Sequence, residues 1–135
     1  MKTNYSRVYC QSGFNMSVQA SKTNYNEPRD DTGPYTAVEI GFPSAPEPLI
    51  IGYAEDSDRP TETVYGWVPA GLVTALVSKH GGIESGELPP LNIDAKQAAI
   101  LAETLTEINL DLDPTDLDIN TAIAEESMWE IWGDQ

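Results

Sequence analysis

Apolar and polar residues alternate in short runs through the first half of the chain, which is the pattern of half-buried strands. The five runs cover residues 6–10, 16–20, 35–42, 49–53 and 63–68, of which 49–53 is continuously apolar and predicts a more buried strand. Segments rich in proline, glycine and aspartate separate them, most clearly at residues 24–34 and 43–48. We expect a mainly antiparallel sheet in which the last two runs pair with each other through the acidic loop between them.

Residues 69–82 change to the period of a helix. Pro69 suits the first helical position, because its missing N–H leaves no hydrogen bond unmade there. Lys79 and His80 lie where the helix dipole favours cations, and Gly81-Gly82 can supply a left-handed cap. One apolar stripe is formed by Leu72, Val73, Leu76 and Val77. The pattern predicts a helix that packs this stripe on the sheet.

A linker at residues 84–92 is expected to separate this part from a more acidic tail. Asp94 can cap a helix that runs to about residue 109, and Asp113-Pro114 is typical of another helix start. The apolar face of the first of these helices is formed by Ala98, Leu101, Leu105, Ile108 and Leu112. We therefore predict an α+β fold: a small antiparallel sheet with one packed helix in residues 1–90, and an acidic helical hairpin in residues 91–135.

The chain of 135 residues carries 22 acidic and 7 basic residues, a formal net charge of −15. Residues 91–135 hold eleven carboxylates against one lysine, Lys96. This excess opposes direct contact with nucleic acid, because that affinity comes from Lys and Arg replacing counterions on phosphates, and it opposes binding to anionic membranes. With one cysteine, no signal peptide and no long apolar run, the sequence predicts a soluble, cytoplasmic protein.

Candidate catalytic and metal-binding groups are few. Cys10 and His80, the only thiol and the only imidazole, could form a nucleophilic pair, but a strand position for Cys10 and a helix-capping role for His80 explain them as well. Residues 111–119 space aspartates like a calcium loop, yet Asp116 and Ala122 stand where an EF-hand needs glycine and glutamate. We expect no enzyme activity, no cofactor and no bound metal.

The acidic tail is the strongest functional candidate. Fifteen net charges over a domain roughly 40 Å long give about one charge per 2.7 Å, within a factor of two of the ~1.7 Å of duplex DNA. Such a surface attracts basic grooves, and tryptophan is enriched at binding hot spots. We predict a non-enzymatic inhibitor that mimics nucleic acid and occludes the basic site of a host protein. The residues predicted to bind the partner are Glu103, Glu107, Asp111, Asp113, Asp116, Asp118, Glu125, Glu126, Trp129 and Trp132.

Two other functions stay open. Arginine beside tyrosines can clamp a phosphate and stack on a base, so a nucleotide-like ligand could bind at Tyr25, Arg29, Tyr35 and Arg59. This alternative predicts a homo-oligomer whose interfaces build the pocket. A virion or scaffold component, which would form large assemblies, is the third.

Four stretches resemble small uncharacterised proteins of tailed bacteriophages: PYTAVEIGFPS, YAED, TVYGWVP and KHGGIESGELPP. The resemblance covers roughly residues 16–90 and leaves out the acidic tail. It implies an early phage protein that interferes with a host system, and many such proteins act as acidic inhibitors. For the inhibitor predicted above, the target would be a host protein such as a defence nuclease or a polymerase. It carries over no catalytic or binding residue.

Overall fold

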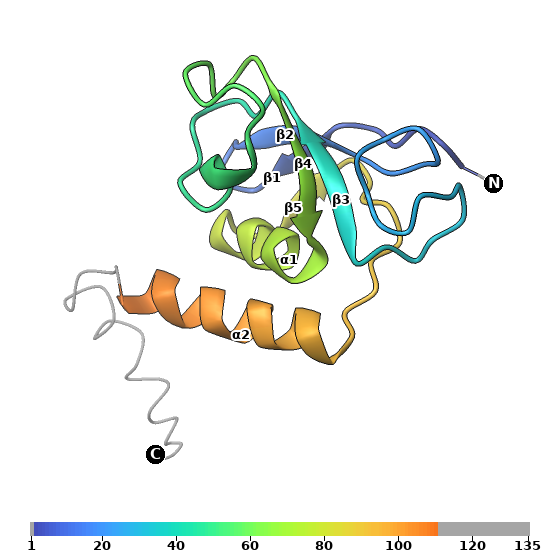
Figure 1. The fold of residues 1–135 in the computed structure, drawn as a ribbon. Helices are drawn as coiled ribbons and strands as arrows, with labels where there is room; N and C mark the ends of the chain where they lie inside the picture. Colours follow the sequence, from blue (N-terminus) through green and yellow to red (C-terminus); the bar gives the residue numbers. More distant parts are fainter. Residues whose placement is uncertain (1, 111–135) are drawn as a thin grey trace. The chain divides into compact units, whose positions relative to one another are not determined.

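The computed structural model describes residues 2–110. The chain divides into two units, residues 1–105 and 106–135, and the fold below is that of the first. Its elements are β1 (Val8–Cys10), β2 (Asn15–Gln19), β3 (Ala37–Gly41), the 3₁₀ turn η1 (Ile51–Tyr53), β4 (Val64–Pro69), α1 (Ala70–Lys79), β5 (Ile83–Ser85) and α2 (Ala95–Leu110), of which the part up to Leu105 belongs to the first unit. Figure 1 shows their arrangement.

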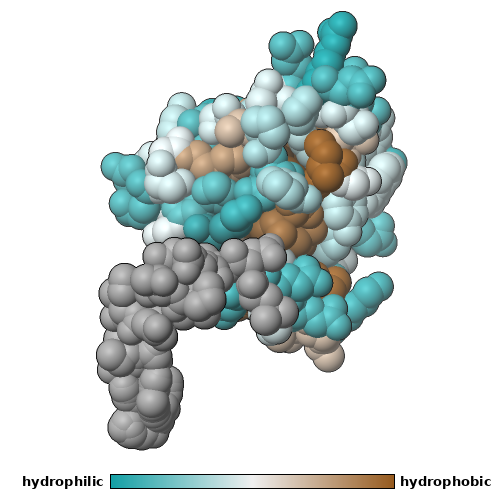
Figure 2. Space-filling view, turned by 90° about the vertical axis from the view of Figure 1, so that its left-hand side faces the viewer, coloured by the Kyte–Doolittle hydropathy of each residue, from teal (hydrophilic) through white to brown (hydrophobic). Residues whose placement is uncertain are grey.

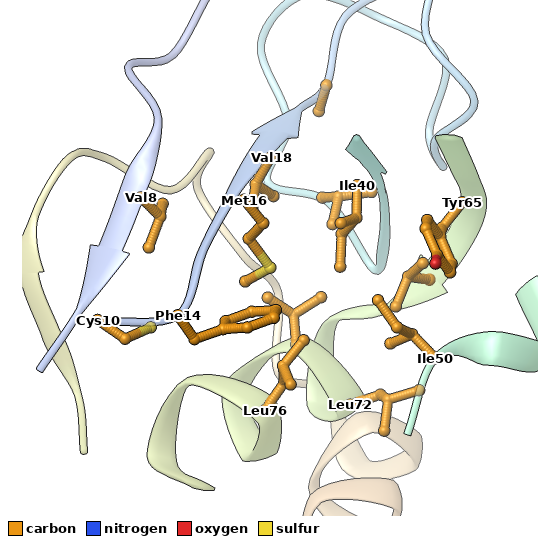
Figure 3. Packing of buried hydrophobic residues seen from close by; sticks show 14 of the residues in the cluster. Val8, Cys10, Phe14, Met16, Val18, Ile40, Ile50, Tyr65, Leu72 and Leu76 are labelled. Carbon is orange, nitrogen blue, oxygen red and sulfur yellow. The ribbon is translucent and has the colours of Figure 1, made fainter. Parts of the chain in front are cut away.

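The strands form one five-stranded sheet in the order β4-β3-β2-β1-β5, and every neighbouring pair is antiparallel. The α+β prediction is confirmed, and the second helix of the predicted hairpin lies outside the described residues. Helix α1 covers one face of this sheet, and its stripe packs on the inward-facing strand residues (Figure 3). The fully buried side chains include Val8, Met16, Val18, Val38, Ile40, Tyr65, Val68, Val73 and Leu76. Strand alternation and helical period thus meet in one core.

The predicted strand at residues 49–53 is wrong. The Glu47 carboxylate accepts the N–H of Leu49, and the Glu47 carbonyl accepts the N–H of Ile50. These local bonds turn the backbone into η1 instead of leaving its N–H groups for a ladder. Strand β4 therefore pairs with β3, and the expected pairing shrinks to a single bridge between Ala54 and Tyr65.

The expected linker at residues 84–92 is part of the fold. It begins inside β5, which pairs with β1, and at its other end Pro90 and Asn92 bond the backbone of Tyr35. Gly86 has φ +97°, and a Cβ there would lie under 3.0 Å from the backbone of Arg7. Glycine is needed at this point because the segment runs against the backbone next to β1.

Helix α2 begins as predicted, since the Asp94 carboxylate accepts the N–H of Gln97 at 2.9 Å. Its packed face matches the expected one in part, since Leu101, Leu105 and Ile108 are half-buried and Leu112 lies outside the described residues. Ala98 is exposed, whereas the polar side chain of Gln97 is buried and accepts the N–H of Gly71, in the first turn of α1, at 2.8 Å. A buried glutamine therefore satisfies one of the unpaired N–H groups with which α1 begins, a role that apolar periodicity does not reveal.

Candidate interaction site

A β-bulge interrupts the pairing of β3 with β4. Val38 opposes Val68 and Ile40 opposes Tyr65, so Glu39 alone faces the two residues Gly66 and Trp67. Trp67 has φ +53°, in the left-handed region that a bulky residue rarely adopts. Its side chain is 49% exposed. The bulge has turned a large aromatic ring out of the ladder and toward the surface.

Tyr25 completes an aromatic pair with Trp67. The two rings stack with centroids 4.9 Å apart at 23°, and the carbonyl of Tyr25 accepts the N–H of Trp67 at 3.0 Å. A Cβ on Gly66 would lie 3.2 Å from the Cβ of Tyr25, so a larger residue there would press against Tyr25. An isolated glycine in a strand pattern often marks a bulge or a close backbone approach, and Gly66 marks both.

Glu39 holds the segment that carries Tyr25. Its carboxylate accepts the side-chain N–H of Asn24 at 2.8 Å and the backbone N–H of Tyr25 at 3.4 Å. We name Asn24, Tyr25, Glu39, Gly66 and Trp67 the aromatic site. It combines an exposed, positioned ring pair with a carboxylate. The sequence pattern predicted Trp67 only as a strand residue and did not indicate this site.

The residues predicted to bind a partner are only partly described. Glu103 and Glu107 are exposed on α2. The other eight, Asp111, Asp113, Asp116, Asp118, Glu125, Glu126, Trp129 and Trp132, lie outside the described residues. The aspartate-rich stretch 111–119 lies outside them too.

The four residues of the nucleotide alternative do not form a cluster by contact. Tyr25 belongs to the aromatic site, whereas Tyr35 is fully buried and donates its hydroxyl to the carbonyl of Asp30 at 2.9 Å. Arg29 is exposed, and Arg59 pairs with Asp56 at 4.0 Å. Within residues 2–110, no hydrogen bond, ion pair or ring contact joins either arginine to either tyrosine.

A hollow of about 500 Å³ lies apart from those four residues, between the N-terminal segment and the chain after β5. Its lining includes Lys2, Tyr5, Thr32 and Glu87. Lys2 forms an ion pair with Glu87 at 2.8 Å, and its ammonium lies 5.8 Å from the centre of the Tyr5 ring. The cation in this hollow is thus already balanced by a carboxylate of the chain.

A second polar cluster surrounds Glu47, whose side chain is only 3% exposed. Its carboxylate accepts bonds from Lys79 Nζ at 3.0 Å, His80 Nε2 at 2.8 Å and the N–H of Leu49 at 2.9 Å. Burial raises the pKa of Glu47, but the N–H of Leu49 and the side chains of His80 and Lys79 outweigh it and hold the pKa below its ordinary value. Glu47 is therefore ionised at neutral pH and joins the 43–48 loop to the end of α1.

The imidazole of His80 links this cluster to the turn after β1. Its Nδ1 lies 3.1 Å from Ser12 Oγ, and its ring stacks on Phe14 with centroids 4.3 Å apart. Cys10, the other member of the hypothetical nucleophilic pair, is 1% exposed, and burial raises the pKa of its thiol. The structure therefore gives His80 a serine and a glutamate as neighbours. We name Ser12, His80 and Glu47, with Lys79 and Phe14, the His80 cluster.

Among the described residues, no group of three or more His, Cys, Asp or Glu side chains is placed to hold a metal ion. No helix in this part of the chain is long and apolar enough to cross a membrane. The face seen in Figure 2 is largely hydrophilic and carries separate apolar patches. Comparison with protein-family models, with curated proteins and with solved structures gave no match.

Proposed function

We propose that this chain is a cytoplasmic interaction protein, encoded by a bacteriophage, that binds a basic host protein and blocks its nucleic-acid site. Its effect on the host protein comes from binding and needs no turnover of a substrate. The observation that carries the proposal is Trp67, held half-exposed and left-handed on a β-bulge. The acidic residues attract the partner, and the aromatic site anchors it.

The conformational strain in the backbone of Trp67 supports a binding role for its side chain. A non-glycine residue in the left-handed region costs on the order of 1–3 kcal/mol, and glycine at position 67 would avoid that cost. The ring gains about 0.5–1.5 kcal/mol from stacking on Tyr25, which offsets the strain only in part. A strained, half-exposed tryptophan is accounted for when its ring is used in binding, since tryptophan is prominent among binding hot spots.

Charge supports a basic partner. Residues 1–110 contain fourteen acidic and seven basic residues, so the chain is acidic even without its last 25 residues, which add eight acids and no base. Glu103 and Glu107 are exposed on α2. A field of this sign speeds association with basic surfaces and weakens as salt rises. It repels nucleic acid itself, which leaves the proteins that hold nucleic acid as the natural class of partner.

The test is capture of host proteins on the full chain, followed by measurement of whether the captured protein binds duplex DNA or RNA in competition with it. Replacing Trp67 by glycine should reduce the affinity of the chain for the captured protein at least ~30-fold. This is a loss of about 2 kcal/mol, as expected for a hot spot. Because lost stacking and relieved strain oppose each other, the free energy of unfolding should change by less than about 1 kcal/mol.

The matched control is Tyr9→Ala, which removes another exposed aromatic ring, 45% exposed on β1, and should leave affinity unchanged. Neutralising Glu103 and Glu107 together should slow association and flatten its salt dependence. Capture that is equal for wild type and Trp67→Gly, or a partner unaffected by nucleic acid, would refute the proposal. A rise in melting temperature on addition of a nucleotide would favour the ligand-binding alternative instead.

A further inference from the structure

The hydrogen bonds of the His80 cluster have a definite direction. The Glu47 carboxylate is ionised and can only accept, so it accepts a hydrogen bond from the N–H of His80 Nε2 at 2.8 Å. In the neutral imidazole the other ring nitrogen, Nδ1, carries the lone pair and accepts from the hydroxyl of Ser12 at 3.1 Å. The hydroxyl oxygen of Ser12 in turn accepts the N–H of Phe14 at 3.3 Å. Each donor therefore has an acceptor, in the order serine, histidine, glutamate.

We propose that Ser12 is a nucleophile, activated by His80 and Glu47, that takes the acyl group of activated carboxylic esters. A serine bonded to an imidazole that a carboxylate orients is the arrangement that activates hydroxyl nucleophiles on unrelated folds. Ser12 Oγ attacks the carbonyl carbon, and its proton passes to His80 Nδ1. When the ester C–O bond breaks, the leaving oxygen takes that proton. Water then hydrolyses the acyl-serine by the same proton route, releasing the carboxylic acid and restoring Ser12.

The geometry keeps the imidazole in place for this role. The ring stacks on Phe14 at 15°, and its partner Glu47 is fixed by Lys79 and by the N–H of Leu49. Backbone bonds hold the turn that carries Ser12, including one from its own N–H to the carbonyl of His80 at 3.0 Å. The histidine is only 19% exposed, whereas Ser12 is exposed. An ester in solution can therefore reach the hydroxyl without displacing the base.

The same turn limits the class of ester. The N–H groups of Gln11, Ser12 and Gly13 are already bonded to carbonyl oxygens of the chain, so they do not stabilise the oxyanion of a tetrahedral intermediate. The reaction then depends on a leaving group that departs easily. Aryl esters, whose phenolate is stable, meet this need, whereas amides and alkyl esters do not. Ser12 is thus expected to be acylated rapidly only by activated acyl donors.

The experiment uses the full chain and p-nitrophenyl acetate. Release of p-nitrophenol is followed by absorbance, and the acetylated residue is located by peptide mass spectrometry. We expect acetylation at Ser12, its loss in Ser12→Ala, and a rate at least ~100-fold lower in His80→Gln, since a positioned general base contributes 10²–10⁴-fold. Ser44→Ala is the matched control, because Ser44 is also exposed and accepts a single backbone N–H, from Asn15, and it should react like wild type.

Circular dichroism of each variant shows whether it is folded. Ser12→Ala removes one exposed hydroxyl, so it should fold even if His80→Gln does not. Acetylation spread over lysines and other serines, or a rate unchanged in Ser12→Ala, would overturn the inference. This activity is independent of the binding function, because Ser12→Ala leaves the aromatic site and the acidic residues intact. Its failure would therefore leave partner capture unaffected.

Discussion

Replacing Glu47 by alanine should lower the free energy of unfolding by about 3 kcal/mol, at the lower end of the 3–5 kcal/mol expected when one partner of a buried ion pair is removed. The side chain is 3% exposed and serves Lys79, His80 and the backbone of the loop that carries it. Lys79 is 32% exposed and can turn to water, which keeps the loss from being larger. Urea unfolding followed by circular dichroism measures the change.

Glu62→Ala is the control for this prediction. Glu62 is an exposed glutamate in the loop before β4, and its loss should change stability by no more than about 0.5 kcal/mol. If the two substitutions cost the same, Glu47 does not hold the 43–48 loop to the end of α1.

The stabilising effect of Glu47 should also depend on pH. Its pKa in the folded protein is below the ordinary value of 4.5, so the stabilisation is fully present above that value and is lost as the pH falls through the folded-state pKa. The difference in unfolding free energy between wild type and Glu47→Gln should therefore be largest near neutral pH and shrink in acid. A difference that stays constant or grows between pH 7 and pH 3 would contradict the assignment of the shift to this cluster.

Gly71→Ala is the second substitution with a large expected effect. It should destabilise the protein, although helix propensity alone predicts that it stabilises α1. Alanine in place of glycine stabilises an exposed helix by about 1 kcal/mol. In α1, however, a Cβ on Gly71 would lie under 3.0 Å from the carbonyl oxygen of Gln97 in α2. Backbone cannot rotate away as a side chain can, so α2 must move and the bond from Gly71 N–H to Gln97 is lost. We expect destabilisation of about 1–3 kcal/mol.

Gly52→Ala is the matched control, since a Cβ there meets nothing within 4 Å. It should be neutral or slightly stabilising, because alanine restricts the unfolded chain. Hydrogen exchange should place the effect of Gly71→Ala on the amides of the first turns of α2. A variant at position 71 that is as stable as wild type would show that α2 does not need this close approach.

Much of the fold could be predicted because its signals are local. Period-two alternation marked the strands that became β1, β2, β3 and β4, and the apolar stripe with a terminal glycine pair marked α1. The strand prediction for residues 49–53 was wrong because a continuous apolar run of five residues has no periodicity that distinguishes a strand from other structure. There the backbone conformation depends on the hydrogen bond from the N–H of Leu49 to the carboxylate of Glu47, which the composition of the segment does not predict.

The candidate sites depended on long-range contact and were harder to predict. His80 was recognised as the only imidazole, but its neighbours come from positions 33 and 68 residues away. The sequence predicted Trp67 as a strand residue next to a glycine. The outward position of its ring comes from the β-bulge, where β4 has one residue more than β3. Neither relation leaves a periodic trace.

By itself the sequence determined the acidity of the chain, the α+β class and most element positions, because charge, period and turn residues act over a few neighbouring positions. The tertiary structure alone decided which side chains meet. It placed Trp67 on Tyr25, gave His80 its serine and glutamate, and seated Gln97 on Gly71. Such contacts arise when strands and helices pack in three dimensions, and packing joins residues whose distance along the chain is unrelated to their distance in space.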